Sequence, residues 1–254
     1  MASPVPREPS APAASVAVCV IAYEAATTIE EVLASIPSRA GESTVATFVS
    51  DDASSDDTAE VARRWAERAG CAEATEVVRQ PVNLGYGGNQ RACFRWALEH
   101  DVAALAMLHG DAQYPGAAVA DLLAPILAGT ADVVLGSRML DPGGAQRGGM
   151  PAVRRVGNRA LSWAQNQLTG IELSEWHTGM RAYRTDLLRG LDLDALPSGF
   201  DFDTAATLAA LDAGARFAEI PIDTRYAGEV SRIPLWRTGA QILGRTIRHR
   251  WRAR

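Results

Sequence analysis

The sequence has no lysine, so all 25 of its basic residues are arginines. Chemistry that requires a lysine side chain is therefore excluded. Cysteine is also scarce, and Cys19, Cys71 and Cys93 show neither a CxxC spacing nor a Cys/His pattern. These absences argue against a disulfide framework and against a zinc site, and we expect a reducing, cytoplasmic location.

Long apolar runs are missing as well. No stretch approaches the roughly 18 uninterrupted apolar residues of a membrane-spanning helix. The formal net charge of −5 argues against a general nucleic-acid binder, so no nucleic-acid partner is expected. Residues 1–15 are rich in Pro, Ala and Ser without the apolar region of a signal peptide, which predicts a disordered leader.

The sequence does contain a regular alternation of short apolar runs and segments of helical period, which is typical of βαβ units around a mainly parallel sheet. With 254 residues and 47% apolar content, we expect one α/β domain over residues 16–231. The predicted strands are Val16–Ala22, Val45–Ser50, Ala74–Arg79, Ala103–Leu108 and Asp132–Leu135. Helix starts are indicated by two capping-box spacings, Thr27 with Glu30 and Asp57 with Glu60, and by Pro115, which suits a first helical turn.

The alternation breaks after Leu135, and the rest of the chain no longer has a doubly wound pattern. The segments predicted there are a Gly-rich loop (Asp141–Met150), a helix (Ala152–Leu168), a strand (Thr178–Tyr183), a helix (Phe202–Ala213), a strand (Arg216–Ile220) and a final helix from Leu235.

Polar residues follow the first two predicted strands, where ligands bind in open α/β sheets. Ala22, Tyr23 and Glu24 follow the first strand, and Asp51 and Asp52 follow the second. Acidic side chains at a strand end can accept hydrogen bonds from a nucleobase or from ribose hydroxyls. The alternative for the second loop is an Asx-turn that leads to a helix cap at position 56 or 57.

A glycine-rich segment, PVNLGYGGNQRA at residues 81–92, follows the third predicted strand. Gly85, Gly87 and Gly88 permit the backbone to approach a ligand closely, and the helix that follows would present free N–H groups to anionic oxygen. The segment is not the dinucleotide fingerprint, because Gln90 stands where that motif requires Gly or Ala. The alternative is an ordinary tight turn.

Asp111 and Gln113 stand just beyond the fourth predicted strand, in MLHGDAQYP. Two residues apart in an extended segment, they can point the same way and offer oxygen ligands to Mg²⁺ or Mn²⁺, which phosphates and water complete. The alternative is that Asp111 caps the helix expected near Pro115.

Arginines follow the fifth predicted strand. Arg138 comes directly after it, and Arg154, Arg155 and Arg159 lie in PAVRRVGNR. Because arginine binds phosphate bidentately, this set suits a diphosphate leaving group or a phosphate-bearing acceptor. For any single arginine the alternative is a surface salt bridge, and its position after a strand favours Arg138.

Eight blocks, taken in order, resemble the family 2 glycosyltransferases of the GT-A fold, most of all the dolichol- and polyprenyl-phosphate hexosyltransferases. The blocks are AYEA, VSDDASSDDT, NLGYGGNQRA, GDAQYP, GSR, PAVRRVGNR, EWHTGMRAY and TRYAGEVSR. The resemblance spans about Val16 to Ser231, and the co-occurrence of the blocks is far more specific than any one of them.

The resemblance implies roles for individual positions. The nucleotide-sugar side would comprise Ala22, Tyr23, Glu24, Asp51, Asp52, Asn83, Gly85 and Gly88. Asp111 would be the metal-binding acid of the DxD motif, with Gln113 as a second contact. Arg138 and Arg154 match basic positions that face the acceptor phosphate, and Arg159, Thr178 and Gly179 would lie on the acceptor side.

Three positions depart from the family pattern. His109 stands where DxD has its first acid, so either Asp111 is the lone acidic ligand or the imidazole also ligates, which would favour Mn²⁺ over Mg²⁺. The alternative for His109 is a packing residue. Glu24 replaces a common Asn, and Glu175 stands where many members have Asp.

The resemblance implies an inverting, metal-dependent transfer of a hexose from a nucleotide sugar, of the GDP-mannose or UDP-glucose type. A polyprenyl phosphate is the expected acceptor. The alternatives are a soluble acceptor, such as a natural-product aglycone or a sugar, and a catalytically inactive nucleotide-sugar-binding protein. A nicotinamide-dependent dehydrogenase is disfavoured by the incomplete glycine fingerprint.

Residues 232–254 form a separate basic segment without an acidic residue. Its apolar residues recur at near-helical spacing, which predicts a basic amphipathic helix. These residues are Leu235, Trp236, Ile242, Leu243, Ile247 and Trp251. One interpretation places the helix on the inner face of the cell membrane, where a polyprenyl phosphate would be found, and the other packs it on the domain.

Overall fold

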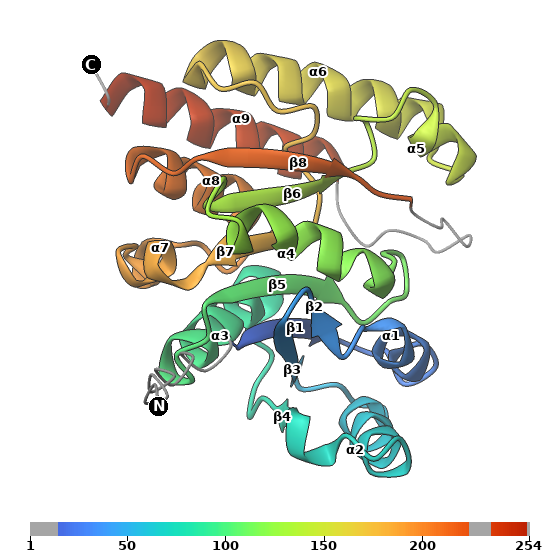
Figure 1. Cartoon of the computed structure of the whole chain (residues 1–254). Helices are drawn as coiled ribbons and strands as arrows, with labels where there is room; N and C mark the ends of the chain where they lie inside the picture. Colours follow the sequence, from blue (N-terminus) through green and yellow to red (C-terminus); the bar gives the residue numbers. More distant parts are fainter. Residues whose placement is uncertain (1–14, 224–234, 253–254) are drawn as a thin grey trace, which may run out of the picture.

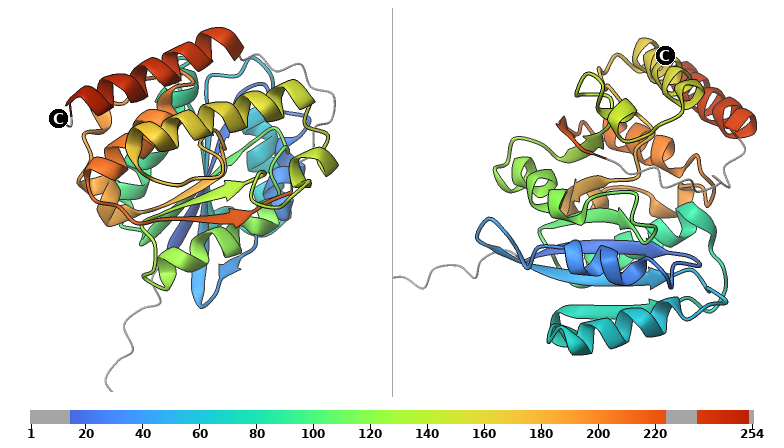
Figure 2. Two further views of the ribbon diagram at one scale, coloured as in Figure 1. Left: turned by 90° about the horizontal axis from the view of Figure 1, so that it is seen from above. Right: turned by 90° about the vertical axis from the view of Figure 1, so that its right-hand side faces the viewer.

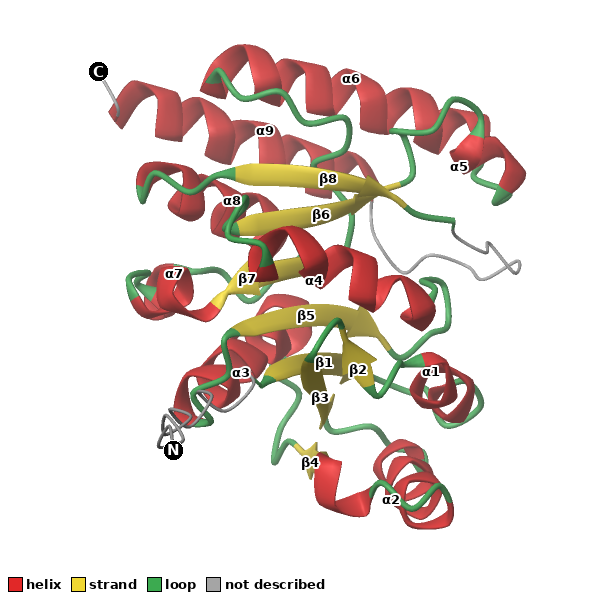
Figure 3. Ribbon diagram, in the orientation of Figure 1, coloured by secondary structure: helices red, strands yellow, loops and turns green. Residues whose placement is uncertain are grey.

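The computed structural model describes residues 15–223 and 235–252, and within these ranges helices cover both faces of a mixed sheet (Figures 1 and 3). The strands are β1 (Val16–Ala22), β2 (Arg39–Ala40), β3 (Ser43–Asp51), β4 (Thr75–Arg79), β5 (Ala104–His109), β6 (Val133–Ser137), β7 (Arg181–Arg184) and β8 (Phe217–Pro221). The α-helices are α1 (Ile29–Ser35), α2 (Thr58–Arg68), α3 (Gly85–Glu99), α4 (Val119–Leu127), α5 (Gly144–Arg147), α6 (Ala152–Thr169), α7 (Thr185–Arg189), α8 (Phe202–Asp212) and α9 (Leu235–Arg252).

The sheet has the order β2-β3-β1-β5-β7-β6-β8, and β4 pairs with the second half of β3. Its long strands are parallel, as predicted, except that β7 runs antiparallel to both of its neighbours, β5 and β6. The carboxyl ends of the parallel strands therefore share one edge, and the chain enters β7 at that same edge. The right panel of Figure 2 views the molecule from this side.

Alternate residues of β1 enter two separate cores, because successive side chains of a strand point to opposite faces. Val16, Val18 and Val20 pack with residues of α1 and α4, whereas Ala17 and Cys19 pack with residues of α3 and α8. Coverage on both faces explains why β1 is a continuous apolar run and is buried along its whole length.

The strand predicted at Thr178–Tyr183 instead begins at Arg181. Its first predicted residues make other contacts: Gly179 donates its N–H to the Tyr114 hydroxyl (2.9 Å), and the Thr178 carbonyl accepts from Arg181 Nε (2.7 Å). The short elements β2, α5 and α7 were not predicted. The predicted loop at residues 141–150 contains α5.

The two predicted capping boxes are wrong in detail. α1 follows Thr28, one residue later than expected, and α2 follows Asp57, but neither residue caps its helix through its side chain. The first N–H of α2, on Thr58, is accepted by Asp56 (3.1 Å). Asp56 also accepts from Ala26 N (3.0 Å). The same carboxylate therefore caps the start of α2 and joins the loop after β1 to the loop after β3.

α6 and α9 lie side by side as an outer layer, at the end of the molecule opposite α2 (Figures 1 and 2). α9 contacts α6 and α8, and its residues Ile242 and Thr246 are buried. The middle of the predicted C-terminal helix therefore packs on the domain, against helices and not against the sheet. Among the described residues, no helix has both the length and the apolar character needed to cross a bilayer.

Three sequence predictions lie outside the described residues. They are the disordered leader for residues 1–14, the TRYAGEVSR block from position 224 onward, and the domain boundary at position 231.

Candidate active site at the carboxyl edge of the sheet

The loops after β1, β3 and β5 meet at the carboxyl edge. The Ala22 carbonyl accepts the N–H of Asp52 (2.8 Å), and the Ile21 carbonyl accepts the N–H of Gly110 (2.9 Å). The Gly110 carbonyl in turn accepts the Thr28 hydroxyl (2.7 Å). The structure therefore brings the predicted nucleotide-binding loops directly beside the predicted metal-binding loop.

Glu24 ties the first loop to the second. Its Oε1 accepts the Ser55 N–H (2.9 Å) and the Ser55 hydroxyl (2.8 Å), while its own N–H donates to Ser54 Oγ (2.9 Å). Glu24 has a positive φ of 53°, which most L-residues avoid. The neighbouring Tyr23 is 48% exposed. The Glu24 carboxylate thus organises the loop, and nucleoside contact by either residue stays a prediction.

Asp51 and Asp52 have different environments. Asp51 is fully buried, and its Oδ1 accepts the Ser54 N–H (3.1 Å) and the Ser54 hydroxyl in the turn that was considered as the alternative. Asp52 accepts the Leu84 N–H (2.6 Å), and its carbonyl accepts Asn83 Nδ2 (3.2 Å). Burial raises the pKa of Asp52 above its ordinary value. Asp52 is therefore the acid that joins the second loop to the third.

The glycines after β4 serve packing within the protein. Gly85 begins α3 with a φ of 75°, and a Cβ on it would lie 2.9 Å from the Ser198 carbonyl oxygen. A Cβ on Gly87 would lie 2.3 Å from the Pro197 carbonyl, and the Gly87 N–H donates to the Ser198 carbonyl (2.9 Å). Gly88 is buried in the first turn of α3. Of the first N–H groups of α3, which were expected to be free for an anionic ligand, those of Gly85 and Gly87 are taken up within the protein.

Asp111 follows β5 in a tight Asx-turn. Its Oδ1 accepts the Gln113 N–H (3.1 Å) across Ala112, which has a positive φ of 58°. A 3₁₀ turn (Gly116–Ala118) precedes α4, and its N-cap position is Pro115, four residues beyond Asp111. The alternative role of Asp111 as the cap of this helix is therefore wrong, and Pro115 precedes the helical turn instead of lying within it.

His109 sits between two tyrosine rings. Its ring lies edge-on to Tyr86 and to Tyr114, with centroid distances of 5.6 and 5.1 Å. Tyr86 donates its hydroxyl to Asp203 (2.8 Å), so the Tyr86 oxygen is the acceptor for His109 Nε2, 3.4 Å away. In this network the His109 Nε2 donates to the Tyr86 oxygen. The ring also explains Gly179, because a Cβ there would lie 2.3 Å from it.

Sequence reasoning missed Tyr86, Tyr114, Asp203 and Arg181. Arg181 is fully buried, and its Nη1 donates to the Asp203 carbonyl (3.2 Å). Tyr86 and Asp203 are 117 positions apart. A local pattern could not join them, although Arg181 and Tyr86 both stand inside blocks that carry the family resemblance.

Arg138 forms a buried ion pair with Glu175. Arg138 donates its backbone N–H and Nε to the carboxylate (both 2.8 Å), and its Nη2 donates to Glu175 and to the His177 carbonyl (3.1 Å). Asn158 Nδ2 donates to the same carboxylate (2.7 Å). Burial raises the pKa of Glu175, but the Arg138 charge and these hydrogen bonds lower it below its ordinary value. The Arg138 charge is thus balanced within the protein, and its contact with a phosphate stays a prediction.

The other acceptor-side predictions lie on the segment entering β7 and on α6. Thr178 and Gly179 are buried beside Tyr114. Arg154 is half-buried one turn before Asn158, so both lie on the same face of α6. Arg159 is exposed, turned from Asn158 by about 100°. Arg154 therefore lies closer to the acceptor side than Arg159 does.

The residues at this edge fit a divalent cation that is shared with a diphosphate. Within the described ranges, no group of three or more His, Cys, Asp or Glu side chains could hold a metal by itself. One carboxylate, from Asp111, with Gln113 nearby, is the sparse oxygen set that Mg²⁺ and Mn²⁺ take when phosphates and water complete the shell. The donor set suits Mg²⁺ or Mn²⁺ and does not suit a structural zinc site.

His177 gives the site a pH-dependent stability. Its Nδ1 lies 3.1 Å from Asn158 Oδ1, and its Nε2 is buried without a hydrogen bond to any described residue. Burial lowers the pKa of His177 from 6.5 to about 4. The unfolded chain therefore binds the proton more readily, and this contribution to stability is present above pH 6.5 and is lost as the pH falls toward 4.

Between about pH 7 and about pH 4.5, we expect the free energy of unfolding to fall by on the order of 2 kcal/mol less in His177→Gln than in the wild-type protein. Urea unfolding of the variant and the wild-type protein at both pH values would measure it. Parallel pH dependence of the two proteins would show that His177 is not the titrating group.

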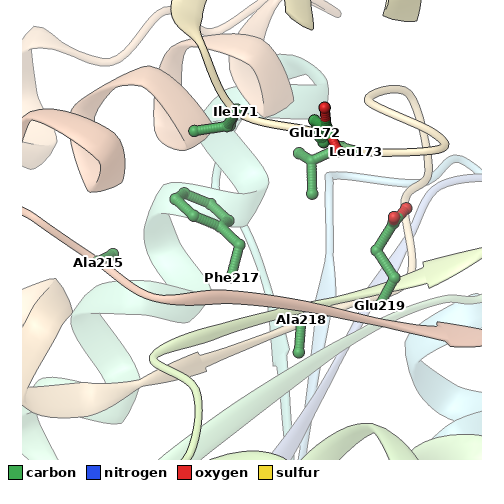
Figure 4. A pocket seen from close by; sticks show the side chains of 7 residues that line it. All are labelled: Ile171, Glu172, Leu173, Ala215, Phe217, Ala218 and Glu219. Carbon is green, nitrogen blue, oxygen red and sulfur yellow. The ribbon is translucent and has the colours of Figure 1, made fainter.

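A cavity of about 360 Å³ lies elsewhere, beside the edge strand β8 (Figure 4). It is lined by Ile171, Glu172, Leu173, Ala215, Phe217, Ala218 and Glu219. Glu219 joins β8 to the segment before β7, because it accepts the Ser174 N–H (2.8 Å) and hydroxyl (2.7 Å). None of the predicted site residues lines this cavity, so it is separate from the candidate site.

The sequence matches known proteins over most of its length. Residues 17–195 match the family described as Glycosyl transferase family 2. The chain is 35% identical over 177 residues to an undecaprenyl-phosphate mannosyltransferase of Micrococcus luteus, which covers 69% of this chain and 70% of that protein. It is 30% identical over 176 residues to a polyprenol monophosphomannose synthase of Mycolicibacterium smegmatis, covering 69% and 64% of the two chains.

The fold is similar to that of glucosyl-3-phosphoglycerate synthase from Mycobacterium tuberculosis. The TM-score is 0.69 with its complex with Mg²⁺ and UDP, at 20% identity, covering 93% of this chain and 79% of that one. It is 0.68 with the complex with Mn²⁺, UDP and phosphoglyceric acid, at 18% identity, covering 93% and 78%. Together with the sequence matches, this GT-A fold rules out the dehydrogenase interpretation. The chain belongs to glycosyl transferase family 2 and resembles its polyprenyl-phosphate hexosyltransferases.

Proposed function

We propose that this protein transfers a hexose from a nucleotide sugar to a polyprenyl phosphate, with inversion at the anomeric carbon. The position of Asp111 carries the proposal. It follows β5, which lies between β1 on one side and β7 on the other. The loops of Asp52 and of Thr178 and Gly179 would thus place donor and acceptor on either side of one carboxylate.

On the donor side, Asp52, Asn83 and Tyr23 would hold the nucleoside. Asp52 is 4% exposed, and a carboxylate that is largely removed from water interacts strongly with N–H and hydroxyl donors of a base or ribose. Asn83 is oriented by its hydrogen bond to the Asp52 carbonyl. The half-exposed Tyr23 offers a ring face. We propose a donor of the GDP-mannose or UDP-glucose type, and the names of the mannosyl-transferring relatives favour mannose.

Asp111 and Gln113 would hold Mg²⁺ or Mn²⁺ against the donor diphosphate. When bound, the cation would neutralise the charge that develops on the departing diphosphate. The Asx-turn fixes the Asp111 carboxylate before any ligand arrives, because its Oδ1 is already held by the Gln113 N–H. His109, two residues earlier, would be a further candidate ligand through its Nδ1.

On the acceptor side, a phosphate monoester is already anionic at neutral pH and needs no strong general base. Arg154, half-buried on the face of α6 that carries Asn158, would attract it. Arg138 would act by holding Glu175 and the backbone of His177, which sets the shape of the segment leading to Thr178. The relatives named as undecaprenyl-phosphate and polyprenol enzymes support this acceptor class, and we propose a cytoplasmic location for the reaction.

The test is a transfer assay with purified protein. GDP-mannose and UDP-glucose would each be supplied with a short-chain polyprenyl phosphate, with Mn²⁺, with Mg²⁺ or with EDTA. The release of nucleoside diphosphate and the mass of the lipid product would be measured. We expect a glycosylated lipid with one donor, and only when a divalent cation is present.

Two results would contradict the proposal. Transfer to phosphoglycerate or to a sugar, but not to the lipid, would establish a soluble acceptor, for which the fold likeness to a phosphoglycerate-glycosylating enzyme is the supporting observation. Nucleotide-sugar binding without any turnover would establish an inactive binding protein.

A further inference from the structure

The distribution of polar and apolar residues on α6 is the reverse of that on an ordinary surface helix. A helix on a globular protein normally buries an apolar stripe. The buried residues of α6 are instead Ser162 and Gln165. Ser162 accepts the Trp176 N–H (3.1 Å), and Asn166 accepts the Trp176 indole N–H (2.6 Å). Asn158 binds Glu175 from the same side. Hydrogen bonds to Glu175 and Trp176 therefore hold the inner face of α6 on the domain.

The outer face of α6 is apolar over its first three turns. Val153, Val156 and Trp163 are 76%, 65% and 66% exposed, and Ala160 between them is exposed too. At 100° per residue these four positions fall within an arc of about 80°. Single exposed apolar residues are common, but a continuous stripe on one helix is typical of a surface that meets another apolar phase.

The charges around this stripe have one sign. α6 contains Arg154, Arg155 and Arg159 and no acidic residue. Arg159 is exposed at one border of the stripe, about 80° from its centre, and the half-buried Arg155 lies farther round the helix on the same side. Such a border favours an anionic surface and would repel a basic partner.

α9 continues the same pattern beside α6. The two helices run side by side in the same direction (Figure 1), and Gln165 of α6 donates to Thr246 of α9 (3.4 Å). Ile247 and Trp251, one turn apart, are 39% and 76% exposed. The sequence of α9 also contains no acidic residue. Its inward basic groups are already paired, since Arg245 Nε donates to Asp201 (2.9 Å) and His249 Nε2 lies 2.7 Å from Asp212 Oδ1.

We propose that the outer face of α6, defined by Val153, Val156, Ala160 and Trp163, docks on an anionic membrane surface together with the end of α9. This deepens the proposed function, because it rests on an acceptor that resides in the bilayer. It also moves the main contact away from the C-terminal helix alone, since Ile242 is used in packing and only Ile247 and Trp251 remain as exposed large apolar residues of its described part. An interfacial helix with an apolar stripe and flanking arginines binds through burial of the stripe and attraction to anionic headgroups.

Docking on this face would also orient the enzyme. Asn158, on the inner side of α6, contacts both Glu175 and His177, and Arg154 lies one turn away. A bilayer against the outer side of α6 would therefore lie one helix diameter, about 10 Å, from the acceptor side of the site. A lipid phosphate could reach the site while its chain stays in the membrane.

The test is co-sedimentation of the full-length protein with vesicles of phosphatidylcholine, with and without phosphatidylglycerol. We expect binding to the anionic vesicles, and at least about a tenfold lower partition coefficient for the double variant Val156→Ser with Trp163→Ser. Leu127→Ser, which alters an exposed apolar residue at the end of α4, is the matched control and should stay within about twofold of the wild type. Arg159→Glu should weaken binding to anionic vesicles and leave the residual binding to neutral vesicles unchanged.

Three outcomes would overturn the proposal: no binding of the wild-type protein to anionic vesicles at low salt, equal losses in the double variant and the control, or a change of oligomeric state. In the last case, light scattering would show a wild-type dimer that the double variant makes monomeric while vesicle binding is unchanged, and the face would join two copies of the chain. The Tm of each variant shows whether it is folded. Transfer to a short-chain, water-soluble polyprenyl phosphate should be the same in the double variant and the wild type. If neither protein transfers the sugar, the proposed function is rejected, and the vesicle measurements alone decide the membrane contact.

Discussion

Asp111→Asn is expected to lower kcat/KM for sugar transfer by about 10²- to 10³-fold or more, because it removes the carboxylate proposed to hold the cation at the leaving diphosphate. The substitution keeps an oxygen at Oδ1 that can accept the Gln113 N–H, so the Asx-turn should survive. Calorimetry of nucleoside diphosphate binding with and without Mn²⁺ would measure the loss directly. We expect the cation to strengthen binding in the wild-type protein and to have little effect in the variant.

Gln113→Ala is the graded comparison for this prediction. A neutral amide contributes less to a hard cation than a carboxylate does, so this variant should lose less activity than Asp111→Asn. An Asp111→Asn variant with near-native turnover and an unchanged Mn²⁺ effect would reject the metal site at the end of β5.

Arg138→Ala is expected to destabilise the protein by about 3–5 kcal/mol, because it leaves the Glu175 carboxylate buried without its cation. Glu175 is fully buried, and Arg138 supplies it with hydrogen bonds from the backbone N–H and from the guanidinium. Urea unfolding would measure the loss. Arg138→Lys should recover only part of it, since an ammonium cannot reproduce the forked contact. Arg245→Ala is the matched control, because its side chain is 30% exposed and its partner Asp201 can be solvated.

The double variant Arg138→Met with Glu175→Leu separates folding from catalysis. Replacing a whole buried ion pair by apolar residues is often nearly neutral for stability. We expect this variant to be more stable than Arg138→Ala and yet to transfer sugar poorly, because His177 loses the Nη2 contact that fixes its carbonyl. Equal losses of activity at Arg138, Arg154 and Arg245 would show instead that general surface charge is responsible.

The sheet and its functional edge could be predicted because they depend on short-range patterns. β1 is buried on both faces, so its sequence is a continuous apolar run that ends at a polar residue where the strand ends. The same reasoning located the ends of β3, β5 and β6, and hence the loops that meet at the edge. Whether each predicted side chain there contacts a ligand stays a prediction.

The roles of single polar residues were harder to predict, because their partners are distant in the sequence. Glu175 lies 37 positions from Arg138, so the sequence alone could not show that this arginine is paired. The need for glycine at position 87 also comes from a distant residue. A Cβ there would collide with the carbonyl of Pro197. Even the local prediction of a capping box at Asp57 was wrong, because Asp56, the other position considered for a cap, accepts the Thr58 N–H and also reaches Ala26 across the loop.

The reversed strand β7 has a consequence for how this enzyme can change. It is inserted between β5 and β6 and is entered from the carboxyl edge, so the segment that leads into it brings Thr178 and Gly179 to the edge where the donor loops lie. Residues proposed to hold the donor fall between positions 22 and 113, and those proposed to face the acceptor fall between 138 and 179. The proposed donor and acceptor specificities are therefore encoded in separate stretches of the sequence, so substitutions in one stretch leave the residues of the other unchanged.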